Sequence, residues 1–109
     1  MIALMSGVPT NVCDGTTTGA ITGTPFAVPF RTFPTINPLA VKTGNVSAFE
    51  YTVQASVDGT TFVPLVTGIT SQADFNANQY LFVAPVLRID QVSRTGGTSQ
   101  AIYVTLGQY

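Results

Sequence analysis

The sequence predicts an all-β fold, an antiparallel β-sandwich of jelly-roll type with an extended N-terminal segment. From Phe49 to Asp58 apolar and polar residues alternate strictly, so odd-numbered residues are expected to face the core and even-numbered residues the solvent. Short apolar runs separated by Gly, Pro and Asp recur downstream, and no segment has a convincing amphipathic-helix pattern. At 109 residues, the chain has the length of one domain.

Residues 1–23 are predicted to form an extended arm or loop, and residues 24–109 to form the sandwich. Residues 1–5 suit either a short edge strand or a docking arm, and the stretch from Ser6 to Thr24 is rich in Gly and Thr without a sustained period. The alternatives are an arm that becomes ordered on a neighbouring subunit, a loose terminus or a core strand. If it is an arm, its deletion leaves a folded β domain; loss of folding would indicate a core strand.

The segment from Pro25 to Pro38 places three phenylalanines between four prolines. Because Pro cannot donate to a strand ladder, such a segment belongs at a sheet edge or in an extended connection. We therefore expect an extended crossing segment that packs Phe26, Phe30 and Phe33 into the core.

A short strand over 39–42 and a turn over 43–45 lead into a hairpin from Val46 to Leu65. The pair Asp58-Gly59 is typical of a type I′ turn, in which the central residues adopt positive φ. Pro64 indicates an edge or a bulge near the end of the second strand.

The remaining elements are short. A helical turn is expected over Ser71–Phe75, with Ser71 as its N-cap. Strands are predicted at Tyr80–Val83 and at Val86–Val92. A Gly96-Gly97 hairpin turn then leads into a last strand, Ala101–Leu106, whose even-numbered residues face one way.

The most informative feature of the composition is its low content of charge. Charged residues make up 8% of the chain, against roughly 25% in an average soluble domain, and the formal net charge is −1. We infer that other subunits cover much of the surface. Four Lys and Arg residues without a basic cluster argue against nucleic acid as a partner. No apolar run is long enough to span a membrane, and the N-terminus lacks the features of a secretory signal, which predicts an intracellular origin.

No reactive constellation is evident, so we predict that the protein is not an enzyme and needs no cofactor or metal. The chain has no histidine, the commonest general base and metal ligand, and Cys13 is its only cysteine. Glu50 and Asp58 share a strand face but would lie about 26 Å apart, too far for a glycosidase pair. Arg88 and Asp90 suit a surface ion pair.

Partner contacts are expected in the N-terminal segment and on exposed tyrosines. Tyrosine rings also suit sugar stacking; strand periodicity places Tyr51 with the core and Tyr103 on the opposite face to Ile102 and Val104. The candidate partner-binding residues are Ile2, Leu4, Met5, Val8, Val12, Tyr103 and Tyr109.

The run from Phe49 to Phe62, followed by Pro85–Ile89 and the Gly-Gly turn, resembles two families. One is the small jelly-roll cement or decoration proteins of tailed bacteriophage capsids, which are similar in length, charge content and Thr/Gly content. The other, weaker resemblance is to discoidin-type domains, through the pattern Ser56-x-Asp58-Gly59-x-x-Phe62. The phage resemblance implies a dimer or trimer on the capsid exterior that clamps major capsid subunits.

Three functional hypotheses follow. The first is a non-enzymatic virion protein, a capsid cement or decoration protein that is assembled in the host cytoplasm and binds the major capsid protein and copies of itself. The second is a carbohydrate-binding or receptor-binding β-sandwich module. The third is a subunit of a phage tail or neck connector, which would differ from the first in symmetry.

Overall fold

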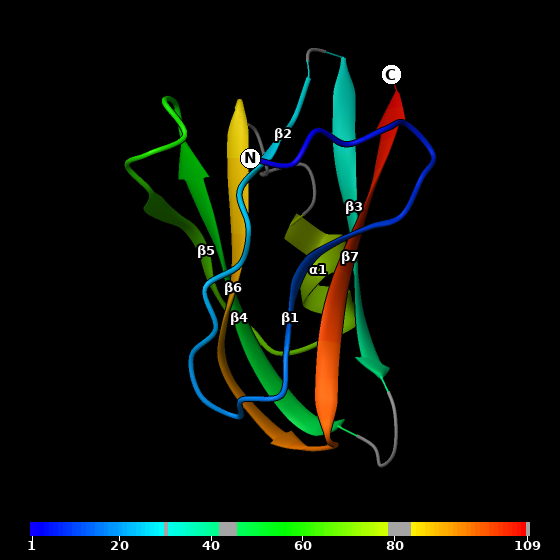
Figure 1. Cartoon of the computed structure of the whole chain (residues 1–109), viewed down its shortest axis with the longest axis vertical. Coiled ribbons are helices and arrows are strands. Elements are labelled where there is room, and N and C mark those ends of the chain that lie inside the picture. Colours follow the sequence, from blue (N-terminus) through cyan, green and yellow to red (C-terminus); the bar gives the residue numbers. More distant parts are fainter. Residues whose placement is uncertain (30, 42–45, 79–83, 109) are drawn as a thin grey trace.

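Seven strands and one short helix make up the part of the chain described here, residues 1–29, 31–41, 46–78 and 84–108 of a computed structural model (Figure 1). Two antiparallel sheets pack face to face, with strand orders β1-β7-β3 and β2-β6-β4-β5. The predicted all-β sandwich is confirmed. The elements are β1 Thr10–Gly15, β2 Phe26–Ala27, β3 Thr32–Val41, β4 Val46–Ser56, β5 Val63–Ile69, α1 Gln72–Asn78, β6 Val86–Gly96 and β7 Ser99–Gln108.

The core lies between the inner faces of the two sheets. Leu87 and Ile89 of β6 are fully buried, whereas Arg88 between them reaches the outer face, as the alternation predicts. On β7, the even-numbered residues from Ile102 to Leu106 are buried in the same way. The β1·β7 and β4·β6 ladders thus each present an apolar face to the other sheet.

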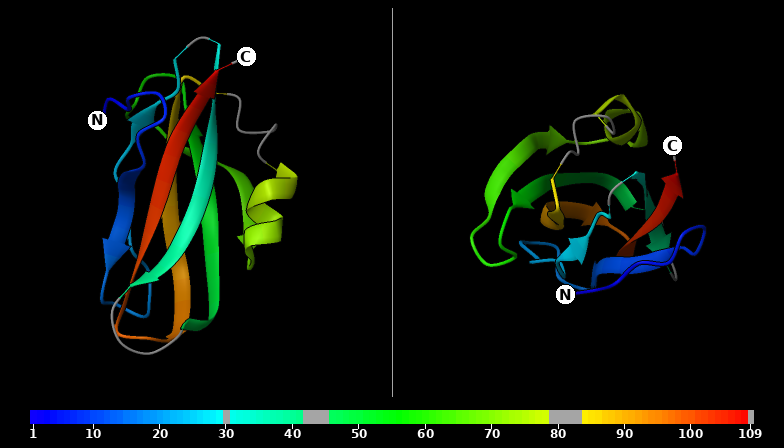
Figure 2. Two further views of the ribbon diagram at one scale, coloured as in Figure 1. Left: turned by 90° about the vertical axis from the view of Figure 1, so that its right-hand side faces the viewer. Right: turned by 90° about the horizontal axis from the view of Figure 1, so that it is seen from above.

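The helix α1 covers the open side of the sandwich, where it contacts β3 and β5 (Figure 2). Ser71 Oγ accepts a hydrogen bond of 3.1 Å from Asp74 N, so the predicted N-cap is confirmed. The ring of Phe75 is 1% exposed and lies 5.9 Å from the ring of Tyr51. Gln72 Nε2 ties the helix to β3 by donating to the Ile36 carbonyl at 2.9 Å.

The N-terminal segment contains a strand that lies within the sandwich. β1 pairs antiparallel with β7, and its residues Val12 and Cys13 are 1% and 3% exposed. A bulge between Asn11 and Cys13 lets the consecutive residues Val12 and Cys13 both turn inward. This breaks the period of two, which explains why the sequence predicted no strand here. In this structure, residues 10–15 are therefore core strand and not the extended arm expected over residues 1–23.

The proline-rich segment occupies sheet edges, as predicted. β3 is the outer strand of its sheet and accommodates Pro34 and Pro38, and β2 is the outer strand of the other sheet. Phe26 is fully buried and Phe33 is partly buried, whereas Phe30 lies outside the described residues. Residues 39–41 continue β3 and do not form the separate strand expected over 39–42; the turn expected over 43–45 also falls outside the described residues.

The predicted hairpin is present as β4 and β5, but its turn is longer than expected. Ser56 Oγ accepts hydrogen bonds from the backbone N–H groups of Asp58 and Gly59, and Asp58 Oδ1 accepts from Thr60 and Thr61. Only Gly59 of this turn has positive φ, +80°, so it is not type I′. These local hydrogen bonds replace the two-residue turn. The expected edge position and bulge near Pro64 are confirmed.

Two burial predictions for β4 and its turn were wrong. Val57, expected in the core, is 86% exposed because the strand ends at Ser56 and the chain turns outward. Thr52 and Ser56, expected on the wet face, are 8% and 4% exposed. For Ser56 the reason is the turn itself, whose backbone folds over the hydroxyl that accepts its N–H groups.

The Gly96-Gly97 turn does not form a hairpin. Both glycines have positive φ, as a tight turn requires, but β6 and β7 belong to different sheets. The connection therefore crosses from one layer of the sandwich to the other. The strand predicted at Tyr80–Val83 lies outside the described residues.

Candidate functional site

Two surface features are candidates for function, and the first is an apolar strip along β5. Val63 and Leu65 are 59% and 38% exposed on this outer strand, and Val57 in the turn before it is 86% exposed. Met1, itself 69% exposed, reaches this region, because its Cε would lie 3.0 Å from a Cβ placed on Gly59. We call Val57, Val63 and Leu65 the β5 surface. Large apolar side chains on an outer strand are usual where another protein docks.

The structure separates the N-terminal candidates for partner binding. Ile2 and Leu4 are partly buried and pack against the core, and Ile2 N donates to the Pro25 carbonyl at 2.8 Å. Met5 and Val8 are 69% and 46% exposed and are available to a partner. Val12 lies in the core, where a partner cannot reach it while β1 stays in its sheet.

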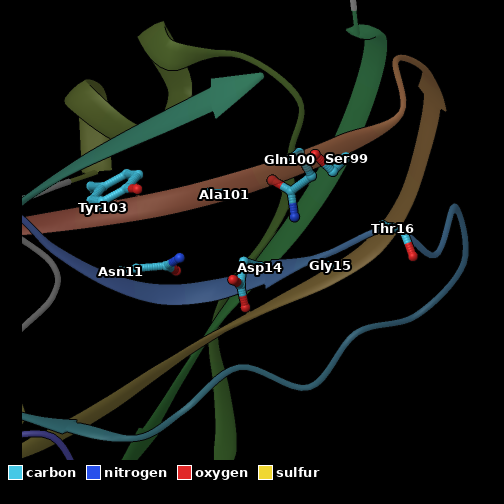
Figure 3. A pocket seen from close by; sticks show the side chains of 8 residues that line it. All are labelled: Asn11, Asp14, Gly15, Thr16, Ser99, Gln100, Ala101 and Tyr103. Atoms are coloured by element: carbon cyan, nitrogen blue, oxygen red, sulfur yellow. The ribbon is translucent and has the colours of Figure 1, made fainter. Parts of the chain in front are cut away.

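The remaining two candidates are tyrosines. Tyr109 lies outside the described residues. Tyr103 is partly exposed on the outer face of β7, as the strand pattern predicts, and pairs across the ladder with Asn11 of β1. It lines the second surface feature, a shallow pocket of about 210 Å³, which we call the Tyr103 pocket. The pocket is lined by Asn11, Asp14, Gly15, Thr16, Ser99, Gln100, Ala101 and Tyr103 (Figure 3).

Asn11 and Asp14 carry the polar groups of the β1 side of the pocket. The β1 bulge brings them together, and Asn11 Oδ1 accepts a hydrogen bond of 3.1 Å from Cys13 N, which fixes the amide. Within the described part of the chain, Asn11 Nδ2 and the Asp14 carboxylate have no hydrogen-bond partner. Both groups are therefore free to bind a ligand.

Gln100 contributes to the wall of the pocket from β7, but its side chain faces the core. It is 3% exposed, and its Oε1 accepts a hydrogen bond from the Tyr51 hydroxyl of the opposite sheet. The same amide also interacts with the buried Cys13 thiol, so it is engaged inside the sandwich.

Burial dominates the electrostatics behind this wall. It raises the pKa of the Cys13 thiol to about 11, although the Gln91 backbone amide and the Gln100 side chain oppose the shift. Burial also raises the pKa of Tyr51 well above its ordinary value, and the nearby Arg94 cation counteracts this in part. Both groups are neutral near pH 7, and the buried thiol is unsuited to act as a nucleophile.

Arg94 and Gln91 of β6 hold the loop that follows β1. Arg94 is 4% exposed and donates to the carbonyls of Gly96 and Thr16, the second at 2.8 Å. Gln91 Nε2 donates to the carbonyls of Thr17 and Gly19, at 2.9 and 2.7 Å. These bonds fix the Thr/Gly-rich loop at the end of the pocket where Thr16 lies.

The expected Arg88–Asp90 ion pair is present, with 2.9 Å between Arg88 Nη2 and Asp90 Oδ2. The guanidinium also lies 4.4 Å from the centre of the Phe62 ring. Asp90 Oδ1 accepts a hydrogen bond of 2.9 Å from Gly23 N. The pair thus links the turn after β4 to the connection before β2, and its role is structural.

The residues in the described ranges contain no group of three or more His, Cys, Asp or Glu side chains that could hold a metal ion. No helix within these ranges is long and apolar enough to cross a membrane. Comparisons with models of protein families, with curated proteins and with solved structures found no match to this chain.

Sequence reasoning missed several residues of both features. Val63 and Leu65 were placed in a hairpin strand, and only Pro64 between them indicated an outer position. Asn11 and Asp14 lie in a stretch without periodicity, and Gln100 was assigned no role. The bulge that brings Asn11 and Asp14 together has no sequence signal we could identify, since it depends on pairing with β7, nearly 90 residues downstream.

Proposed function

We propose that the protein is a non-enzymatic structural subunit of a virion, a capsid cement or decoration protein that binds neighbouring major capsid subunits and copies of itself. The observation that supports this best is the β5 surface. Three large apolar side chains are exposed on the outer strand β5 and in the turn before it, in a chain with only 8% charged residues. Natural proteins usually protect such edges with charge or cover them.

The distribution of charge supports the same proposal. Of the few charged side chains, Arg94 is buried, and Arg88 and Asp90 neutralise each other. The β5 strand itself, Val63–Ile69, contains no charged residue. A surface of this kind is suited to permanent contact with other subunits, which would supply the solubility that the isolated chain lacks.

The strand order supports a jelly roll as the finer description of the sandwich. When an eight-stranded ribbon folds back on itself and rolls up, strands pair first with last, second with seventh and fourth with fifth. The pairs β1·β7, β2·β6 and β4·β5 correspond to these, with the sixth position unfilled by the described residues. Jelly rolls occur in viral capsid proteins and in lectins.

The test is assembly. Sedimentation velocity of the purified chain is expected to show a dimer or trimer, and co-sedimentation with empty shells of the major capsid protein encoded with it is expected to show binding. Val63→Lys places a charge on the β5 surface and should weaken both by at least tenfold. Thr67→Lys, an exposed position on the same strand, is the matched control.

A stable monomer without affinity for shells would refute the proposal. Equal losses in Val63→Lys and Thr67→Lys would show that charge in general, and not the β5 surface, opposes assembly. Electron microscopy of the native particle separates a shell position from the tail or neck ring of the alternative hypothesis.

A further inference from the structure

The chemistry of the Tyr103 pocket favours one class of ligand. Its lining combines one aromatic ring with amide, carboxylate and hydroxyl groups, and it includes no Lys or Arg. An anion would meet the Asp14 carboxylate without a compensating cation, and a purely apolar molecule would leave the polar groups unpaired. We propose that the Tyr103 pocket binds a short neutral saccharide, one ring of which packs on Tyr103.

The shape of the pocket fits this ligand. Tyr103 and Asn11 lie at one end and Thr16 and Ser99 at the other, as Figure 3 shows. From Ser99 to Tyr103 the strand advances four residues, or about 13 Å, which is enough for two pyranose rings end to end. Ala101 is the smallest side chain that β7 contributes to the lining, and the volume of about 210 Å³ equals that of roughly seven water molecules.

The polar groups have the arrangement that sugar hydroxyls require. Adjacent hydroxyls of a pyranose both donate and accept hydrogen bonds, and planar amides and carboxylates pair with them through two atoms at once. Asn11 offers its Nδ2 as a donor, because its Oδ1 is engaged by Cys13 N, and Asp14 offers two acceptor oxygens. The apolar face of a ring then packs on Tyr103 at low entropic cost, since that side chain has few rotatable bonds.

The side chain of Gln100 takes no part in this contact. Its Oε1 accepts a hydrogen bond from the Tyr51 hydroxyl of the opposite sheet, and its amide also interacts with the buried Cys13 thiol. Gln100 therefore faces the core, and the ligand would meet Tyr103, Asn11 and Asp14 on the outer face of the sheet.

This proposal is independent of the assembly through β5, since the pocket lies on the outer face of the other sheet. The test is an NMR titration of the ¹⁵N-labelled full chain with maltose, cellobiose, lactose and N,N′-diacetylchitobiose, together with a glycan array. We expect at least one neutral sugar to shift amide signals of the lining residues, with a Kd on the order of 1 mM. N-acetylneuraminic acid, an anionic sugar, is expected not to bind.

Three variants locate the contact. Tyr103→Ala should weaken binding at least tenfold, and Tyr103→Phe, which keeps the ring, should retain most of it. Asn11→Asp keeps the acceptor for Cys13 N but removes the Nδ2 donor, and should also weaken binding at least tenfold. Thr105→Ala is the control, because Thr105 follows Tyr103 on the same face of β7 but does not line the pocket.

The proposal is overturned if no probe shifts the lining residues at 50 mM and the array is empty. It is equally overturned if Tyr103→Ala binds as well as Thr105→Ala, or if the anionic sugar binds best. Sedimentation of the same variants distinguishes this outcome from failure of the assembly proposal, since Tyr103→Ala leaves the β5 surface intact.

Discussion

β1 and β5 are both outer strands of their sheets, yet their burial is the reverse of what their composition predicts. β1 has the sequence TNVCDG, and its Val12 and Cys13 are almost completely buried. β5 has the more apolar sequence VPLVTGI, and Val63 and Leu65 are exposed to solvent. Composition therefore does not decide which strand forms core. The position in the topology does, because β1 faces the other sheet whereas β5 extends past the edge of the facing layer (Figure 2).

The difference has a functional reading. β1 is polar in composition but contributes two buried residues to the core. Its bulge places Asn11 and Asp14 on the outer side, in the Tyr103 pocket. On β5, Ile69 is buried in the core, but the exposed Val63 and Leu65 gain nothing from being apolar in the isolated chain, so these two side chains are better explained by a partner. The two strands thus mark two separate surfaces, one polar and concave and one apolar and at an edge.

The same substitution at a valine in each strand tests the comparison most strongly. Val12→Lys places a charge in the apolar core, and should lower the free energy of unfolding by about 4 kcal/mol or more. Val63→Lys is exposed and should change it by less than about 0.5 kcal/mol. Urea unfolding followed by circular dichroism measures both.

A small effect of Val12→Lys would mean that β1 is not part of the core in solution. In that case residues 1–23 would behave as the arm that the sequence suggests, and their deletion would leave a folded domain. The structure predicts instead that this deletion prevents folding, because it removes Val12 and Cys13 from the core and the strand that pairs with β7.

The sequence predicted elements whose periodicity is local and missed those that depend on distant pairing. β4, β6 and β7 alternate in sequence, so their inward residues could be assigned correctly from Tyr51 to Val53 and from Leu87 to Ile89. β1 could not be predicted, because two consecutive residues turn inward at a bulge that only β7 defines. Of the candidate site, Tyr103 was found from its strand face, whereas Asn11, Asp14 and Gln100 reach it through tertiary contacts.

A second test examines how the connection after β1 packs. A Cβ on Gly23 would overlap the Ile89 carbonyl oxygen and lie 3.0 Å from the Val12 carbonyl oxygen, so the backbone must move. Gly23→Ala should therefore lower the free energy of unfolding by about 3 kcal/mol. Gly19→Ala, where the nearest atom is a side-chain carbon 3.9 Å away, is the matched control and should have little effect. Equal effects of the two variants would show that the connection does not pack against β1 and β6.

The burial of β1 should also be visible in the pH dependence of stability. The Cys13 thiol has a pKa of about 11 in the folded chain against an ordinary value of 9.0, so the unfolded chain loses this proton first as the pH rises. The stabilisation is complete below pH 9 and is lost between about pH 9 and 11, a change of roughly 2–3 kcal/mol.

Cys13→Ala removes this contribution, together with the part of the raised Tyr51 pKa that the Cys13 charge causes. The variant should be less stable at pH 7, since it loses a buried sulfur, but its free energy of unfolding should fall less steeply from pH 9 to 11. Urea unfolding at each pH supplies the two slopes. Equal slopes would mean that solvent reaches the Cys13 thiol. In that case β1 would not be buried, and the contrast between β1 and β5 would be wrong.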